Sequence, residues 1–375
     1  MVGCVAEPSS PLPSAGSKPP PVRELTPPLP VPWRSTAPAF AALDLGTNNC
    51  RLLVGTPAGQ SFRVVDSFSR IVRLGEGLHH TGRLSPSAMD RALAALQACA
   101  DRLSRRPVRA MRAIATEACR RASNGGEFLT RVRRETGLRV EIISTREEAE
   151  LALESCAPLL SGGGRRALLF DIGGGSTELA WVRLAGTGGQ ANAAPSLIGY
   201  VSLPIGVVTL SERFGAAGFT DAGFEAMVAE VAGRLAAFES VHCIGHEIRL
   251  GGVRLLGTSG TVTTLAGVAL GLTRYRRPLV DGTVLTREAT DQALGLLRRL
   301  GRDGLAQHPC VGGERADFVL PGCAIFEAIR RAWPTPRVMV ADRGLREGML
   351  LRLMRDGTRA GRKRSRTRPA AAGSA

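Results

Sequence analysis

The pattern of hydrophobic and polar positions interleaves short β-prone runs with longer stretches of helical spacing. Short apolar runs bounded by glycines or charged residues predict strands, and they lie at 40–45, 51–55, 108–115, 140–143, 168–172, 179–182, 255–257 and 337–341. Apolar residues spaced three and four apart predict helices, one beginning at 84, one at 145, and others at 262–269, 321–333 and 344–354. The region from 203 to about 239 is also predicted to be rich in helix.

The most informative stretch is a strand that leads Asp171 into three consecutive glycines. Because a short β-prone run follows at 179–182, we predict a strand, a tight polar turn and a returning strand. Glycines let backbone N–H groups approach an anion, and hydroxyl groups add donors. The candidate phosphate-binding residues of this turn are Gly173, Gly174, Gly175, Ser176 and Thr177. Asp171 and Glu178 supply the oxygen ligands that Mg²⁺ prefers when phosphate also holds it, so the stretch predicts a phosphate-and-metal hairpin.

Two other kinds of glycine-rich loop are excluded. A P-loop needs a lysine directly after its second glycine, and the only lysines of the chain are Lys18 and Lys363. A dinucleotide-binding loop needs Gly-x-Gly-x-x-Gly at the start of a helix, and here the third glycine and the helix are both missing. A glycine-rich turn without a ligand is the remaining alternative, and the flanking acids count against it.

A second copy of this scheme begins at Asp44, where an apolar strand again meets an aspartate, an apolar residue and a glycine. The residues of this second copy are Asp44, Gly46, Thr47 and Asn48. A domain-sized interval separates the two aspartates. Two related lobes that each present an Asp-Gly hairpin to a shared cleft resemble the actin-like ATPase and sugar-kinase superfamily. The expected fold class is therefore α/β, with two actin-like (ribonuclease H-like, ASKHA superfamily) lobes and an interdomain catalytic cleft.

The two ends of the chain differ in composition from the middle. Residues 1–38 hold eleven of the 23 prolines and little periodic apolar content, so a disordered leader without a secretory h-region is predicted at 1–37. Residues 359–368 carry six positive charges, and a disordered basic tail is predicted at 356–375. The net charge of +16 comes almost entirely from arginine, whose guanidinium matches phosphate oxygens. This charge supports an anionic substrate without identifying it.

The overall composition, 44% hydrophobic and 22% charged, is typical of a soluble globular protein. No apolar run approaches the length of a membrane span, so no membrane partner is expected. Eight scattered cysteines without a Cys-x-x-Cys pair predict buried thiols in a reducing cytoplasm. A zinc site would have to combine the cluster at 242–246 with His308 and Cys310, and the glycine inside that cluster disfavours it.

Two further positions admit both a functional and a structural interpretation. Ser144 followed by Glu147 predicts a capping box at the start of a helix. Glu148 then lies in the first turn, where the helix dipole favours its ionised form. An ionised glutamate there can take a proton from a nucleophilic water, and a surface acid at a helix start is the alternative. Arg120, beside Arg121, is either a phosphate ligand or a solvated helix residue.

Six ordered motifs make the resemblance specific. They are Asp44-Leu-Gly-Thr-Asn, Thr116-x-Ala-x-Arg120-x-Ala-x-Asn124, Ile143-Ser-x-x-Glu147-Glu148-Ala, Asp171-Ile-Gly-Gly-Gly-Ser-Thr-Glu178, Gly257-Thr-Ser-Gly-Thr261 and Asp342-Arg-Gly-Leu-Arg-Glu-Gly348. Together they closely resemble the Ppx/GppA family of exopolyphosphatases and guanosine pentaphosphate phosphohydrolases, over about 38–355. Longer relatives carry an additional C-terminal helical domain similar to the HD phosphohydrolases, so the chain resembles the short, two-domain form.

The resemblance implies Mg²⁺-dependent phosphoanhydride hydrolysis in a cleft between the lobes. Glu148 matches the general base of the family, and Arg120 matches an arginine that contacts phosphate. Asp171 and Glu178 match its acidic, metal-linked positions. The first phosphate-binding loop of the family is matched by Asp44 with Gly46, Thr47 and Asn48. Where many relatives carry an arginine, this chain has Glu150, whose charge would weaken polyanion binding only if its side chain faces the cleft. The expected domains are a first actin-like lobe at 38–143, joined by a closing helix at 343–355, and a second actin-like lobe at 144–342.

The expected partner is a polyanionic phosphate substrate, either inorganic polyphosphate or guanosine pentaphosphate. One alternative is an actin-like ATPase or kinase, against which the missing chaperone and sugar-kinase motifs count. Another is a non-catalytic protein that binds polyphosphate or guanosine alarmones as a sensor. Nucleic acid is not expected as a partner. Relatives of the family are often dimeric, so a homodimer is expected on that ground.

Overall fold

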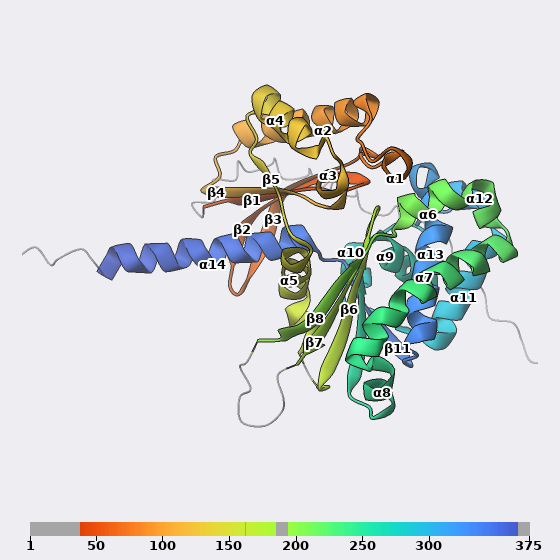
Figure 1. Cartoon of the computed structure of the whole chain (residues 1–375). Helices are drawn as coiled ribbons and strands as arrows, with labels where there is room; N and C mark the ends of the chain where they lie inside the picture. The colour runs from red at the N-terminus through yellow and green to blue at the C-terminus, as the bar shows by residue number, and fades with distance from the viewer. Residues whose placement is uncertain (1–37, 162, 185–193, 367–375) are drawn as a thin grey trace, which may run out of the picture. The chain divides into compact units, whose positions relative to one another are not determined.

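Two mixed β-sheets organise the chain (Figure 1). The computed structural model describes residues 38–161, 163–184 and 194–366, and the predicted leader at 1–37 lies outside them. The first sheet has the order β3-β2-β1-β4-β5, formed by β1 (Phe40–Leu45), β2 (Asn49–Ala58), β3 (Ser61–Ile71), β4 (Ala110–Ala115) and β5 (Val140–Ile142). The second has the order β10-β11-β9-β6-β7-β8, formed by β6 (Arg166–Ile172), β7 (Thr177–Arg183), β8 (Ser196–Leu203), β9 (Val253–Thr258), β10 (Val284–Thr286) and β11 (Arg337–Ala341).

Helices cover these sheets. Around the first sheet they are α1 (Leu78–Thr81), α2 (Pro86–Ser104), α3 (Glu117–Arg121) and α4 (Gly125–Thr136), followed by α5 (Thr145–Cys156). After the second hairpin come α6 (Val207–Phe214), α7 (Asp221–His242), α8 (Ile244–Arg249), α9 (Gly260–Ala269), α10 (Arg277–Val280), α11 (Arg287–Arg299), α12 (Gly301–Gln307), α13 (Ala316–Ala332) and α14 (Leu345–Arg366). Short 3₁₀ helices lie at Ala157–Leu160, Gly215–Phe219 and Gly313–Arg315.

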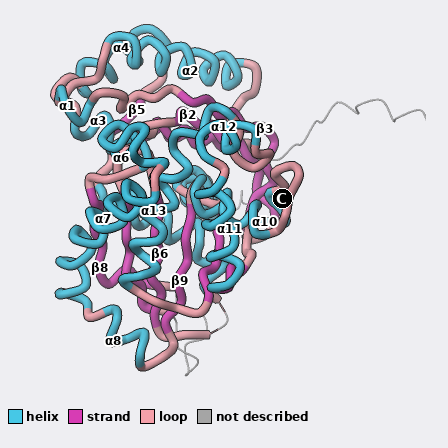
Figure 2. Tube along the Cα trace, turned by 90° about the vertical axis from the view of Figure 1, so that its right-hand side faces the viewer, coloured by secondary structure: helices cyan, strands magenta, loops and turns pink. Residues whose placement is uncertain are grey.

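The outer face of the first sheet is covered by α2 and α4, which lie next to each other over it (Figures 1 and 2). Helix α2 begins where the sequence predicts, because the Ser85 side chain accepts a hydrogen bond from the Ala88 N–H and Pro86 occupies the first turn. Leu43 of β1 joins Leu96 of α2 and Phe128 of α4 in one buried cluster.

One face of the second sheet is covered by α7, α9 and α13. Phe170 of β6 and Trp181 of β7 pack in the same cluster as Phe224 of α7 and Phe326 of α13. Helix α13 begins at Ala316, five residues before the predicted start, and contains Pro321. Pro321 is the sixth residue of this helix, beyond the first turn whose N–H groups lack partners in any case, so it removes one hydrogen bond from the helix interior.

A third buried cluster joins both sheets. Residues alternate between the two faces of a strand, so Phe40 and Ala42 of β1 point into this cluster, as do Ala167 and Leu169 of β6. Asp44 of β1 and Asp171 of β6 are the next residues on these same faces of their strands. The two aspartates therefore lie at the edge of one shared core, on the inner faces of the two sheets.

Helices α5 and α14 complete this shared core. Leu151 of α5 and Leu350 of α14 belong to it, and α14 packs against β1, β2 and α5. A Cβ on Gly348 would lie 2.2 Å from the Leu151 carbonyl oxygen, so only glycine permits this close packing of α14 on α5.

Helix α14 ends later than predicted. The sequence pattern placed its end at 355 and a disordered tail from 356, whereas the helix runs to Arg366. No proline lies between 345 and 368, and the arginines, alanine and lysine of this stretch favour helix more than Gly357 and Gly361 oppose it. Residues 367–375 lie outside the described part. Among the described residues the seven cysteines are free, and no helix combines the length and apolarity required to cross a membrane.

Candidate active site

A cleft of about 930 Å³ brings together most of the predicted site residues. Its walls include both Asp-Gly hairpins, the start of α5, the turn between β9 and α9, and the start of α14. The predicted residues that line it are Asp44, Gly46, Thr47, Asn48, Glu148, Asp171, Gly173, Gly174, Gly175 and Ser176.

The carbonyl groups of the first hairpin are hydrogen-bonded to neighbouring backbone. The Asn48 carbonyl accepts from the N–H groups of Val72 and Arg73 at 2.8 and 3.1 Å, and the Thr47 carbonyl accepts from Gly75 at 2.9 Å. Within the described residues, the N–H groups of Thr47 and Asn48 donate to no protein acceptor. These donors are therefore available to an anion in the cleft.

The second hairpin is arranged in the same way with different supports. Its Gly173 and Gly174 carbonyls accept from Val207 and Val208, the first residues of α6, at 3.0 and 2.8 Å. The N–H groups of Gly174, Gly175 and Ser176 donate to no protein acceptor in the described part of the chain. In both hairpins, the free N–H groups thus face the cleft, and the hydrogen-bonded carbonyl groups face the protein.

Buried acids lie beside these donors, and burial raises their pKa values. Desolvation raises the pKa of Asp171 to about 6, and the positive charge of Arg51 opposes that rise. Desolvation and the neighbouring Asp171 raise the pKa of Glu178 to about 7. Asp44 also has a raised pKa, chiefly from burial. Its Oδ1 atom is fully buried and makes no hydrogen bond with the described residues.

These oxygen atoms fit a divalent cation. Among the described residues no three histidine, cysteine or acidic side chains form a cluster that could hold a metal alone. Mg²⁺ does not require such a cage, since it is usually held by one or two carboxylates together with substrate phosphates and water. Glu178 is held in place because its Oε1 accepts hydrogen bonds from Ser176 Oγ at 2.5 Å and Ser202 Oγ at 2.9 Å. Raised pKa values and the unpartnered Asp44 oxygen both favour a bound positive charge.

Glu148 occupies the position predicted for the base. It lies in the first turn of α5, and only 7% of its surface is exposed. Burial, and next the charge of Glu178, raise its pKa well above the usual value. Its Oε2 accepts a hydrogen bond from Arg120 Nη1 at 3.1 Å. No other hydrogen bond to the Glu148 carboxylate is present within the described residues.

The predicted capping box is half present. Ser144 Oγ accepts from the Glu147 N–H at 3.2 Å and caps α5 as expected. The Glu147 side chain does not return to the cap, because it pairs with Arg112 at 2.7 Å and with Arg352 at 3.6 Å. Glu150 pairs with Arg146 at 2.9 Å and does not line the cleft, so its charge does not face the substrate side.

Three predicted residues stand behind the cleft wall instead of lining it. Thr177 is fully buried, and its hydroxyl donates to the Ile205 carbonyl at 2.7 Å. Glu178 lies close enough to Asp171 and Glu148 for their charges to interact. Arg120 is occupied by two glutamates and the Ile143 carbonyl, so its contact with phosphate stays a prediction.

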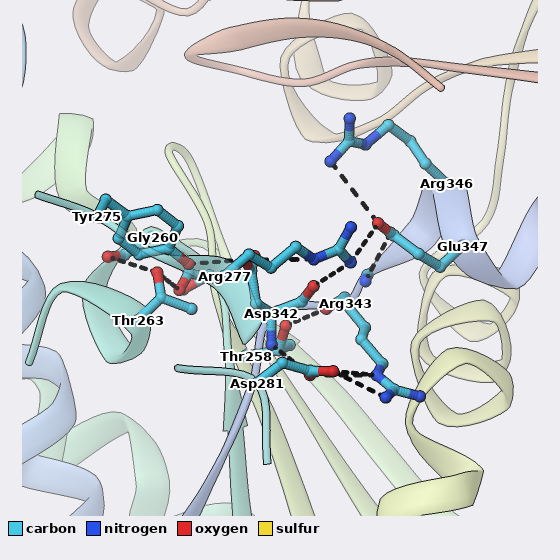
Figure 3. Close-up of polar contacts among 12 residues, drawn as sticks. Thr258, Gly260, Thr263, Tyr275, Arg277, Asp281, Asp342, Arg343, Arg346 and Glu347 are labelled. Atoms are coloured by element: carbon cyan, nitrogen blue, oxygen red, sulfur yellow. Dashed lines mark hydrogen bonds and ion pairs between the residues drawn. The ribbon is translucent and has the colours of Figure 1, made fainter. Parts of the chain in front are cut away.

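The opposite wall is fixed by a polar network at the start of α14, shown in Figure 3. Tyr275 Oη donates to Asp342 Oδ2 at 2.6 Å, and Arg277 Nη2 donates to Glu347 Oε1 at 3.1 Å. Arg343 forms an ion pair with Asp281 at 2.7 Å. This network holds the first turn of α14, and with it the motif at 342–348, against the second lobe.

Sequence reasoning missed Arg51 and Ser259. Arg51 lines the cleft from β2. It follows Asp44 by the same number of residues as Glu178 follows Asp171, so a comparison of the two sequence repeats identifies it. Ser259 has a φ of 90°, an unusual conformation for a non-glycine residue that often marks a functional site. Its hydroxyl is buried without a partner in the described residues.

Comparisons with known proteins agree with the motif assignment. The sequence profile of the Ppx/GppA phosphatase family matches residues 53–356. The solved structure of the Aquifex aeolicus family member is 28% identical, covers 85% of this chain and 98% of its own, and superposes with a TM-score of 0.69. An exopolyphosphatase-like protein is 27% identical, with coverages of 86% and 99% and a TM-score of 0.74. An exopolyphosphatase from Cytophaga hutchinsonii, 24% identical with coverages of 85% and 98% and a TM-score of 0.74, shares the fold.

The predicted fold class is confirmed by the two mixed sheets and by these structures: the chain has the two-lobe actin-like α/β fold. The resemblance inferred from six motifs is confirmed as well, because the family profile spans well over half of the chain. The relationship supports a phosphatase that acts on a phosphate-containing substrate. This chain belongs to the Ppx/GppA phosphatase family.

Proposed function

We propose that this protein is a Mg²⁺-dependent phosphoanhydride hydrolase. It releases terminal phosphate from inorganic polyphosphate, converts guanosine pentaphosphate to the tetraphosphate, or does both. The observation that carries the proposal is the position of Glu148 in the cleft. It is a buried carboxylate with one oxygen held by Arg120 at 3.1 Å, and it shares the cleft with two hairpins that direct unpaired N–H groups inward.

Different residues bind the phosphates and activate the attacking water. The N–H groups of the two hairpins bind phosphate oxygens, and the positive charge of Arg51 adds to the attraction. Glu148 accepts the proton of a water that attacks the terminal phosphorus in line with the leaving oxygen. The raised pKa of Glu148, caused by burial and by Glu178, makes it a stronger base than an exposed glutamate.

Asp171 and Glu178 are the residues that would hold Mg²⁺, together with the substrate phosphates. When bound, the cation neutralises negative charge that develops on the transferring phosphoryl group. Asp44, whose Oδ1 lacks a partner within the described residues, faces the same cleft from the other lobe.

The family relationship and the cleft support hydrolysis over simple binding. The solved exopolyphosphatase-like protein, 27% identical over almost its entire length, supports polyphosphate as the first substrate to test. A buried carboxylate with a raised pKa is what a general base requires, whereas a binding protein for polyanions gains nothing from a negative charge in its site.

The experiment is a comparison of phosphate release from long-chain polyphosphate, guanosine pentaphosphate and ATP with Mg²⁺. Glu148→Gln serves as the control, since it keeps the shape of the side chain and removes the base. We expect the variant to fold and to lose about 10²- to 10⁴-fold in kcat, the usual contribution of a general base.

Each pattern of release has a separate meaning. Loss of terminal phosphates from polyphosphate identifies an exopolyphosphatase, and a preference for guanosine pentaphosphate places the protein in alarmone metabolism. Release from ATP alone would indicate an actin-like ATPase. Tight binding of polyphosphate or guanosine pentaphosphate without any release would overturn the hydrolase in favour of a sensor.

A further inference from the structure

Glu117 is a buried acid that no motif assigned to the site. It is the first residue of α3, directly after Thr116 of the cleft wall, and only 7% of its surface is exposed. A buried carboxylate is costly unless it is paired and hydrogen-bonded. Glu117 Oε2 is paired, because it accepts a hydrogen bond from Arg120 Nη2 at 2.8 Å. Its other oxygen lies 3.7 Å from Arg121 Nε.

Arg120 connects Glu117 to the base. Its Nη2 atom is held by Glu117, while its Nη1 atom donates to Glu148 Oε2 at 3.1 Å and to the Ile143 carbonyl at 2.9 Å. A guanidinium group is planar and rigid. A bond that fixes Nη2 therefore also fixes where Nη1 is presented, and Glu117 determines the position from which Arg120 holds the base.

The arrangement leaves one oxygen of Glu148 for chemistry. Arg120 binds Oε2, and no hydrogen bond to the Glu148 Oε1 atom is present in the described part of the chain. A general base is effective when a neighbouring group orients it and leaves its proton-accepting atom free. Glu117, Arg120 and Glu148 form such a chain, with the free oxygen at its end.

We infer that Glu117 is a positioning residue for hydrolysis: it holds Arg120 so that Arg120 keeps Glu148 turned with its free oxygen toward the attacking water. This inference rests on the proposed function. It differs from a structural role, in which Glu117 would only neutralise a half-buried arginine. A structural role predicts a change in stability, and positioning predicts a change in the chemical step.

The experiment measures kcat and KM for long-chain polyphosphate with Mg²⁺, using the full chain carrying Glu117→Gln. We expect kcat to fall about 10- to 100-fold, the usual cost of losing a partner that orients a reacting group. We expect KM to stay within about twofold, because substrate binding is unchanged when only the chemical step suffers. Arg121→Gln is the matched control: it removes the other charge beside Glu117 and leaves the Arg120 contact, so kcat should not change.

A second variant controls for a loss of activity caused by misfolding of Glu117→Gln. Glu117→Asp keeps the charge and withdraws the carboxylate from Arg120 by one methylene, so it should show the same loss of kcat. The double variant Glu117→Gln/Glu148→Gln tests the connection, because residues that act as one unit give non-additive losses. We expect it to be no slower than Glu148→Gln alone.

The outcomes separate this inference from the proposed function. An unchanged kcat in Glu117→Gln, a change confined to KM, or a further loss in the double variant would overturn the positioning role while leaving the hydrolase intact. Absence of phosphate release by the wild-type protein from every substrate would overturn the hydrolase, and the positioning role with it.

Discussion

The two Asp-Gly hairpins share one backbone plan but differ in the residue opposite the aspartate. In the first hairpin, Asp44 of β1 pairs across the strands with Arg51 of β2. In the second, Asp171 of β6 pairs with Glu178 of β7. Directly opposed residues of antiparallel strands lie on the same face with their Cβ atoms about 4.5–5.5 Å apart. The same scaffold therefore carries an arginine at one site and a second acid at the other.

This single difference changes the electrostatic surroundings of the two aspartates. Arg51 is the largest charge effect on Asp44 and on Asp171, and it lowers the pKa of both. Glu178 has no positive partner among its main influences, and Asp171 raises its pKa further. The first hairpin thus adds a positive side chain to its free N–H groups, whereas the second adds a carboxylate of the kind that a cation prefers.

The largest effect is expected from removing one of the two acids of the second hairpin. Glu178→Gln removes one of the two carboxylates that would hold Mg²⁺ and keeps the side-chain shape. Because a metal supplies several kcal/mol to phosphoryl transfer, we expect phosphate release to fall by at least about 100-fold. Steady-state assays across Mg²⁺ concentrations measure this loss. Glu150→Gln, outside the cleft, is the control, and equal activity in both variants would refute the metal assignment.

A smaller effect is expected when the first hairpin loses its arginine. Arg51→Gln removes the positive charge next to Asp44, and we expect KM for polyphosphate to rise about tenfold, equivalent to about 1.4 kcal/mol of binding. The Asp171 carboxylate also loses the charge that lowers its pKa, so the acid limb of activity should move to higher pH. Arg134→Gln on exposed α4 is the control. A loss of kcat at constant KM would contradict a binding role.

The supports of the two hairpins provide a matched pair of glycines. A Cβ on Gly206 would lie 2.5–2.6 Å from the Gly174 and Gly173 backbone, whereas a Cβ on Gly75 would lie 2.3 Å from the Thr47 side-chain methyl. Backbone yields less readily than a methyl group, so Gly206→Ala should cost about 1–3 kcal/mol of unfolding free energy. Gly75→Ala should cost less, and urea denaturation compares the two. A larger cost for Gly75→Ala would show that the first hairpin is the stiffer one.

The last prediction concerns the dependence of stability on pH. In the metal-free protein, burial raises the pKa of Asp171 to about 6 and of Glu178 to about 7, above unfolded values of about 4. Groups with a raised folded-state pKa stabilise the fold below the unfolded pKa, and this contribution is lost as pH rises through about 4–7. Mg²⁺ should therefore stabilise more at pH 8 than at pH 5.

Thermal unfolding with and without Mg²⁺ at both pH values checks this dependence. A ligand at 100 times its dissociation constant adds about 2.7 kcal/mol, and that gain should be small at pH 5, where protons compete for the carboxylates. Glu178→Gln should reduce the gain at pH 8. An equal shift at both pH values would show that Mg²⁺ binds elsewhere.

Most elements with strong local signals were predicted from the sequence. The strands that carry Asp44 and Asp171, the helix that begins after Ser144, and the final strand at 337–341 all occur. The edge strands β3, β8 and β10 were missed. All three lie at the margin of their sheets with many exposed positions, so they lack the continuous apolar run that identifies a central strand.

The sequence by itself determined the two hairpins, the position of Glu148 in a first helical turn, and the family, because strand periodicity, turn glycines and helix caps act between neighbouring residues. Only the tertiary structure decided which charges meet. Arg120 turned out to hold Glu117 and Glu148, and Thr177 turned out to support the turn through Ile205. Burial and Coulomb interactions depend on distances between segments that lie far apart in the chain, and folding alone sets those distances.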